Sequence, residues 1–154
     1  MVKILFPTLL SLALLAAPAS AADVKIGEIR AFIFLERSGT WSKNLVGSKE
    51  PLFNTMIGEG SAGEPASSLL IDIAVTGDKN SAPKYASAIV NLIQSGKNGQ
   101  RTTTKKGLVG FLFGESGVIH KPLFLENATC APLEIEVKVG KAVKTAKIDF
   151  QCGE

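Results

Sequence analysis

Near the C-terminus, apolar and polar residues alternate without a break, and this pattern restricts the possible folds more than any other feature. Leucine, isoleucine and valine occupy positions 133, 135, 137 and 139, and charged residues stand between them. Successive side chains of a β-strand point to opposite faces of the sheet. The segment 133–139 therefore predicts a strand with one face buried and one face in solvent.

A second alternating segment, 142–150, follows the dipeptide Gly140-Lys141. Glycine at the first position of a two-residue turn is typical of a type II′ β-hairpin. The apolar face of the second segment is interrupted by Lys144 alone. The predicted register pairs Val139 with Ala142, Ile135 with Ala146 and, on the solvent face, Glu134 with Lys147.

Further strands are expected upstream, at 24–35, 68–75, 108–113 and 118–125, with short ones at 41–46 and 51–53. In the first of these, Phe32 and Phe34 lie on the face opposite to Ile33, which suggests cover on both faces. Pro122 places the segment 118–125 at a sheet edge or a bulge. Many short strands separated by turns predict a mainly β, two-sheet antiparallel β-sandwich, Ig-like or C2-like in general architecture.

The segment 82–95 departs from this pattern. Ala86, Ile89, Val90 and Ile93 follow helical spacing, and Pro83 suits a first helical turn. We expect a short helix packed across one end of the sandwich. The β-branched content leaves a strand as the alternative.

The N-terminus has the pattern of a secretory signal peptide. Lys3 precedes an apolar run, 4–17, and Ala19-Ser20-Ala21 supplies small residues at a cleavage position. The run is shorter than the ~20 residues that a transmembrane helix needs. We expect a signal peptide over 1–21, a single domain over 22–154 without a transmembrane segment, and a periplasmic or secreted location.

Two cysteines, Cys130 and Cys152, lie late in the chain. In an oxidising compartment an even number of cysteines predicts a disulfide, here one that closes the open end of the C-terminal hairpin. Two free thiols are the alternative. The sequon at Asn127 matters only in a host that glycosylates exported proteins.

The charge balance argues against a nucleic-acid partner. The chain has 17 basic and 14 acidic residues, and removal of Lys3 with the signal peptide leaves 16 and 14, a net charge of +2. A domain that binds nucleic acid through its charge is usually strongly basic.

Motifs for catalysis or cofactors are weak. Residues 58–63 match G-x-G-x-x-G, but the context lacks the βαβ unit that a dinucleotide site needs. His120 is the only histidine, and nothing resembles a nucleophile elbow. Too few ligands remain for a zinc site once the cysteines are bridged. We expect no cofactor, no metal and no catalytic residues.

The stretch 94–107 is basic and contains no acidic residue. Lys97, Arg101, Lys105 and Lys106 could bind an anionic partner if the stretch is a loop between core elements. A solvated, mobile loop is the alternative.

These features favour an exported, non-enzymatic β-sandwich that binds a protein or glycan partner in the cell envelope or outside the cell, or that assists envelope assembly. One alternative is a hydrolase whose carboxylates converge only in three dimensions. Another is a pilin-like subunit that pairs through an edge strand.

Overall fold

The computed structural model describes residues 24–50, 52–55, 58, 62–83, 86–96, 99–127 and 131–151. Every secondary-structure element in these ranges is a β-strand. The described residues contain no helix long and apolar enough to span a bilayer. The strands are β1 (Lys25–Leu35), β2 (Thr40–Trp41), β3 (Leu52–Phe53), β4 (Ser68–Thr76), β5 (Ala88–Ser95), β6 (Arg101–Leu108), β7 (Val118–Glu126), β8 (Leu133–Val139), β9 (Ala142–Ile148) and β10 (Phe150–Gln151).

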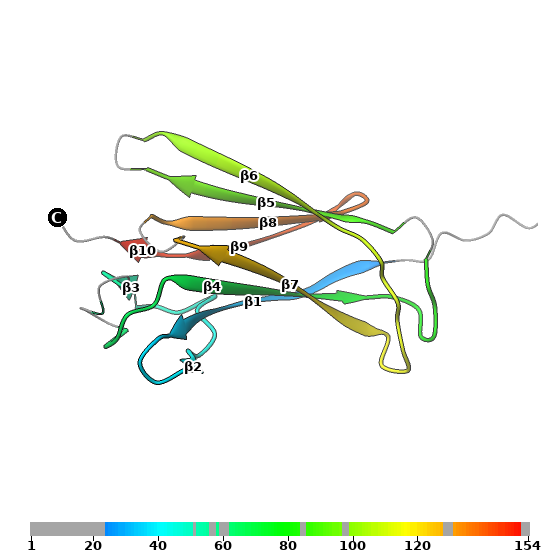
Figure 1. Ribbon diagram of the computed structural model, residues 1–154. Coiled ribbons are helices and arrows are strands. Elements are labelled where there is room, and N and C mark those ends of the chain that lie inside the picture. The colour runs from blue at the N-terminus through cyan, green and yellow to red at the C-terminus, as the bar shows by residue number, and fades with distance from the viewer. Residues whose placement is uncertain are drawn as a thin grey trace, which may run out of the picture.

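Two four-stranded antiparallel sheets form the two layers of a sandwich (Figure 1). One sheet has the order β2-β1-β4-β7 and the other β6-β5-β8-β9, and β1 lies against β8 and β9. A short parallel pair, β3 and β10, lies at one end of the sandwich. We call the opposite end, which contains the turn between β8 and β9, the turn end. The mainly β, two-sheet architecture predicted from the sequence is confirmed.

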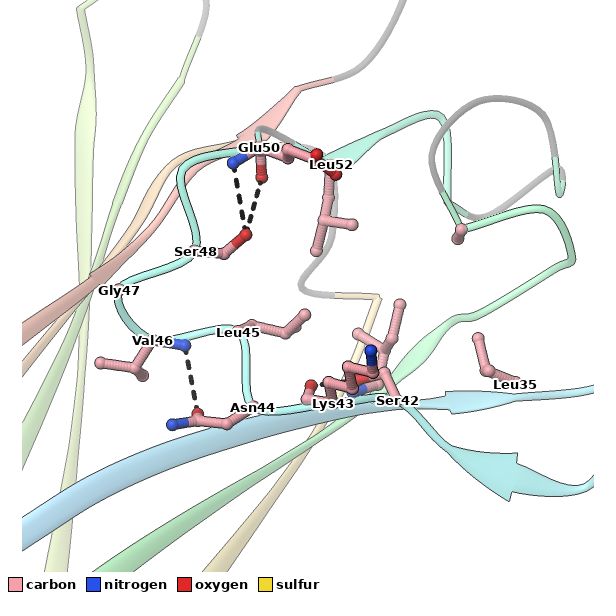
Figure 2. Close-up of a pocket in the computed structure, with 12 residues that line it drawn as sticks. Leu35, Ser42, Lys43, Asn44, Leu45, Val46, Gly47, Ser48, Glu50 and Leu52 are labelled. Carbon is pink, nitrogen blue, oxygen red and sulfur yellow. Dashed lines mark hydrogen bonds between the residues drawn. The ribbon is translucent and has the colours of Figure 1, made fainter.

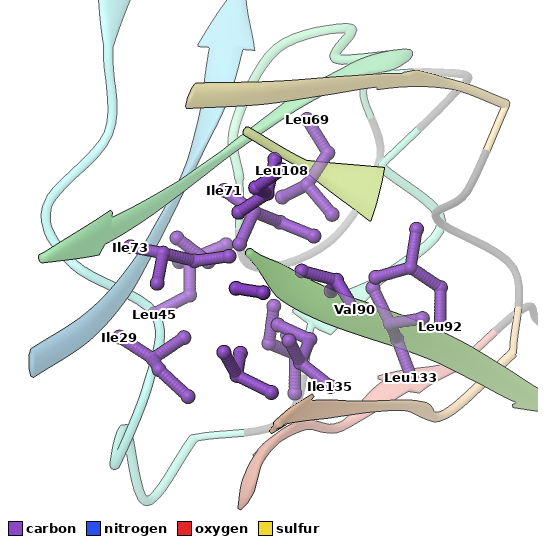
Figure 3. Packing of buried hydrophobic residues seen from close by; sticks show 14 of the residues in the cluster. Ile29, Leu45, Leu69, Ile71, Ile73, Val90, Leu92, Leu108, Leu133 and Ile135 are labelled. Carbon is purple, nitrogen blue, oxygen red and sulfur yellow. The ribbon is translucent and has the colours of Figure 1, made fainter. Parts of the chain in front are cut away.

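The core fills the space between the sheets with the inward-facing residues of both (Figure 3). Ile71 and Ile73 of β4 and Val90 of β5 are fully buried. Alternate residues of each strand supply these side chains, as the period-two pattern requires.

The C-terminal hairpin has the predicted register. Val139 pairs with Ala142, Ile135 with Ala146 and Glu134 with Lys147. Gly140 has a φ of 56°, in the left-handed region that glycine adopts without steric cost. The turn chemistry and the hydrophobic alternation therefore specify the same pairing.

The predicted helix over 82–95 is wrong, because residues 88–95 form strand β5 between β6 and β8. Val90 and Leu92 are buried on its inner face, while Ile89 is exposed on the outer face. The β-branched residues suit a pleated surface, and hydrogen bonding to two neighbouring strands outweighs the weak helical spacing.

The predicted strand over 108–113 is also wrong. β6 ends at Leu108, and residues 109–117 form an irregular connection from one sheet to the other. We call residues 109–117 the crossover segment. Its two phenylalanines, Phe111 and Phe113, point into the core with their rings stacked at a centroid distance of 6.3 Å. The continuous apolar run reflects this anchoring rather than a strand.

Several predictions concern residues outside the described ranges. They are the signal peptide over 1–21, the disulfide between Cys130 and Cys152, and Lys97.

Candidate functional site

A row of apolar side chains crosses the outer face of the β2-β1-β4-β7 sheet, away from the core. Phe32 of β1 lies opposite Leu70 of β4, and Leu70 lies opposite Phe124 of β7. Phe32 and Leu70 are half-buried, while Phe124 is 67% exposed. These residues occupy the strand positions that alternation would reserve for polar side chains on a solvated face.

Two more aromatic residues lie in the same layer. Phe34 of β1 is paired with Trp41 of β2, and their rings meet edge to face at a centroid distance of 5.2 Å. Trp41 is 45% exposed. We call Phe32, Phe34, Trp41, Leu70 and Phe124 together the outer apolar patch.

A charged cluster adjoins the outer apolar patch. Asp72 of β4 lies opposite Arg30 of β1, and its Oδ2 accepts a hydrogen bond of 3.0 Å from Arg30 Nε and a second from the guanidinium Nη2. His120 of β7 places Nδ1 3.0 Å from each oxygen of the same carboxylate. The hydrogen bond and the charge of Asp72 raise the pKa of Arg30 above its ordinary value.

The charged cluster and the patch are in contact. The Arg30 guanidinium lies 5.8 Å from the centre of the Phe32 ring, within the range of a cation–π interaction. Because Asp72 is only 9% exposed and both of its oxygens are hydrogen-bonded, its charge is neutralised within the face. The face therefore offers apolar area beside a prearranged charged pair, without an uncompensated buried charge.

The Asp72–His120 pair resembles two parts of a catalytic triad. Within the described chain, however, no serine, threonine or cysteine side chain hydrogen-bonds to His120. Nor do the described residues contain a group of three or more His, Cys, Asp and Glu side chains able to hold a metal ion.

The predicted basic loop over 94–107 is wrong in its larger part, because residues 101–107 belong to an edge strand. Arg101, Lys105 and Lys106 all belong to β6, where three threonines favour strand pairing with β5. Arg101 forms an ion pair with Glu134 at 3.1 Å. Lys105 and Lys106 are adjacent in the strand and point to opposite faces. The three described cations therefore do not form one cluster.

Two edges of the sandwich carry features that oppose pairing with another strand. β7 pairs only with β4 among the described strands, and Pro122 lies at its centre, so this strand is the edge that the sequence predicted. On edge strand β6, Lys106 lies opposite Val90, whose side chain is buried, and so points to the core side. Proline and inward-facing charges on edge strands are known devices against edge-to-edge association.

The other two edges also carry features that oppose strand addition. On edge strand β9, Lys144 lies opposite Val137, whose side chain is buried, and so points to the core side, where it donates a hydrogen bond of 2.6 Å to the carbonyl oxygen of Gly27. On the β1 edge, the side-chain oxygens of Asn44 and Ser42 accept the N–H groups of Ala31 and Ile33. Asn44 and Ser42 thus take up two backbone donors that another strand would otherwise use.

A pocket of about 490 Å³ lies beside the end of β1, where residues 42–50 fold over it (Figure 2). Its described lining is partly apolar, with Leu35, Leu45 and Leu52, and partly polar, with Ser48 and Glu50. Glu50 is the only acidic side chain among these lining residues. The described part of the lining therefore supplies one of the two carboxylates that a glycosidase-type mechanism needs.

The glycine-rich segment 58–63 precedes a strand. Gly58 and Gly63 have φ values of 76° and 71°, while residues 59–61 lie outside the described ranges. The next described element is β4, so the segment does not lead into the helix of a dinucleotide-binding unit.

Comparison with protein-family models, with curated proteins and with solved structures finds no match to this chain.

Sequence reasoning did not assemble the outer apolar patch. The available signal was the presence of Phe32 and Phe34 on the second face of β1. The sequence suggested that both faces of β1 are covered by other parts of the protein. In the described chain, Phe124 and Trp41 are exposed on the outer face of this sheet. The sequence does not show that Phe124 belongs to the patch, because its position beside Leu70 depends on the pairing of β4 with β7.

Proposed function

We propose that this chain is an exported, non-enzymatic β-sandwich that binds a protein partner in the cell envelope or outside the cell through the outer apolar patch. The observation that carries the proposal is the row Phe32, Leu70 and Phe124, which continues across three strands and leaves Phe124 67% exposed. Exposed apolar patches rimmed by polar residues commonly mark interaction surfaces.

The composition of the patch favours a protein over a glycan. Aromatic residues and arginine are enriched at the centres of protein interfaces. Phe32, Leu70 and Phe124 offer no hydrogen-bonding groups, so the hydroxyl groups of a sugar would lose water against them without compensation. The acceptor oxygens of Asp72 are already engaged by Arg30 and His120.

The alternative of a pilin-like subunit is less well supported. Strand addition needs a free edge with accessible backbone donors and acceptors. Pro122 in β7 and the inward-facing charges Lys106 in β6 and Lys144 in β9 each oppose pairing at a different edge. Binding through a sheet face requires none of these edges.

A matched pair of variants tests the proposed surface. Phe124→Ser removes the most exposed ring of the patch, while Val143→Ser removes an aliphatic side chain that is 54% exposed on the outer face of the other sheet. Affinity-tagged wild type is expected to retain a defined partner from the native compartment, Phe124→Ser to lose it and Val143→Ser to keep it. Equal retention by both variants, with unchanged circular dichroism, would reject the outer apolar patch as the contact.

A further inference from the structure

The crossover segment presents two aliphatic side chains to solvent at the turn end. Val109 is 70% and Leu112 is 69% exposed, the two highest values among the large hydrophobic side chains of the described chain. They alternate with Phe111 and Phe113, which are buried in the core. The segment thus has an anchored side and a projecting apolar side.

The projecting side chains are held by a well-fixed backbone. Lys121 donates hydrogen bonds of 3.0 and 2.8 Å to the carbonyl oxygens of Val109 and Gly110. The N–H of Phe113 donates to the carbonyl oxygen of Ser81 at 2.8 Å. Because the loop is already ordered, burial of its apolar side chains against a partner would cost little conformational entropy.

Charge is distributed unevenly along the sandwich. The half nearer the turn end has nine basic and five acidic side chains among its described residues: Lys25, Arg30, Lys79, Lys105, Lys106, Lys121, Lys138, Lys141 and Lys144 against Glu28, Asp72, Asp78, Glu115 and Glu136. The half nearer β3 and β10 has five basic and six acidic: Arg37, Lys43, Lys49, Arg101 and Lys147 against Glu36, Glu50, Glu64, Glu126, Glu134 and Asp149. The exposed aliphatic side chains therefore belong to the basic half.

We propose that the turn end docks on an anionic lipid bilayer, with Val109 and Leu112 inserted into the interface and the surrounding lysines near the headgroups. Apolar side chains that project from a basic surface match the two layers of such an interface, in which anionic headgroups cover acyl chains. The inference is independent of the proposed function, because the outer apolar patch lies on a sheet face and remains accessible when the turn end is docked.

Vesicle co-sedimentation tests the docking. The probes are vesicles of phosphatidylcholine alone and of phosphatidylcholine with phosphatidylglycerol. The proteins are purified after export and share one N-terminus, determined by sequencing. Wild type is expected to sediment with the anionic vesicles, more weakly at high salt and weakly with the neutral ones. The double variant Val109→Ser/Leu112→Ser is expected to lose about tenfold or more in partitioning.

Two further variants separate insertion from general charge attraction. Val143→Ser, which removes an exposed aliphatic side chain from the outer face of β9, is expected to bind like wild type. Lys105→Glu/Lys106→Glu is expected to weaken binding to the anionic vesicles while the unfolding midpoint stays unchanged. The inference is overturned if wild type does not bind, if Val109→Ser/Leu112→Ser binds as wild type does, or if Val143→Ser loses as much as the double variant.

Discussion

His120 Nδ1 lies 3.0 Å from each carboxylate oxygen of Asp72, so that β7 is tied to β4 by a side-chain contact as well as by the backbone ladder. Arg30 approaches the same carboxylate from β1 on the other side. A single, largely buried aspartate thus connects three neighbouring strands beside the outer apolar patch.

Asp72→Asn is expected to lower the free energy of unfolding by about 1–3 kcal/mol, because the guanidinium and the imidazole lose a charged acceptor in a largely buried position. Asp78→Asn is the matched control, since the side chain of Asp78 makes no hydrogen bond among the described residues. Urea unfolding at neutral pH measures both changes. Equal stability of the two variants would show that the Asp72 cluster does not hold the sheet face together.

Gly77→Ala tests the close packing beneath the crossover segment. A Cβ at position 77 would lie 2.5 Å from the Phe113 ring, whose side chain is fully buried and cannot easily move. A loss of about 1–3 kcal/mol in the free energy of unfolding is expected, as for other overpacked cores. Gly114→Ala should have little effect, because a Cβ there meets no atom within 4 Å. Urea unfolding measures the stability of both variants. Equal free energies of unfolding would contradict the close contact between position 77 and the Phe113 ring.

Glu64 should make the β1–β2 turn sensitive to acid. Its carboxylate accepts the N–H groups of Arg37 and Ser38 at 2.7 and 2.8 Å and the Ser38 hydroxyl at 2.8 Å. The backbone hydrogen bond from Ser38 lowers the pKa of Glu64 below its ordinary value of 4.5, against a smaller opposing effect of burial. A carboxylate with a lowered folded pKa contributes stability that is fully present above the unfolded pKa and is lost as pH falls through the folded value.

Trp41, the only tryptophan, follows this turn and can report the change. Its fluorescence is expected to shift as pH falls below 4.5 in wild type, and the shift should be absent in Glu64→Gln. A fluorescence transition of the same size in wild type and Glu64→Gln would show that a titratable group other than Glu64 causes it.

The two cysteines remain a sequence-based prediction. Unreduced, denatured protein is expected to show no reactive thiol, and the double variant Cys130→Ser/Cys152→Ser is expected to lose roughly 3 kcal/mol of stability. Reaction of two thiols before reduction would contradict the bridge.

The parts of the fold that were predictable are those in which a local pattern and the tertiary structure agree. The alternation of 133–139 and the turn at Gly140 specify the β8–β9 hairpin, and Pro122 correctly marks an edge strand. In β5, the spacing of Ile89, Val90 and Ile93 fits a helix as well as a strand over so few residues, and only its neighbours decide between them.

The candidate site was less predictable because it depends on pairing between distant strands. Phe32, Leu70 and Phe124 are far apart in the sequence and meet only through the order β1-β4-β7. The strand predicted over 108–113 was wrong for a different reason. Phe111 and Phe113 are apolar because they anchor an irregular connection in the core, whereas Val109 and Leu112 are apolar and exposed. Composition alone does not distinguish these cases.

The most direct test of the central claim is site-specific photo-crosslinking in the native compartment. A photoreactive phenylalanine analogue is placed at position 124 in one protein and at position 143 in another, two exposed sites on the outer faces of different sheets. We predict a discrete cross-linked protein from position 124 and none from position 143. Cross-links of equal yield from both positions, or none from position 124, would contradict binding through the outer apolar patch.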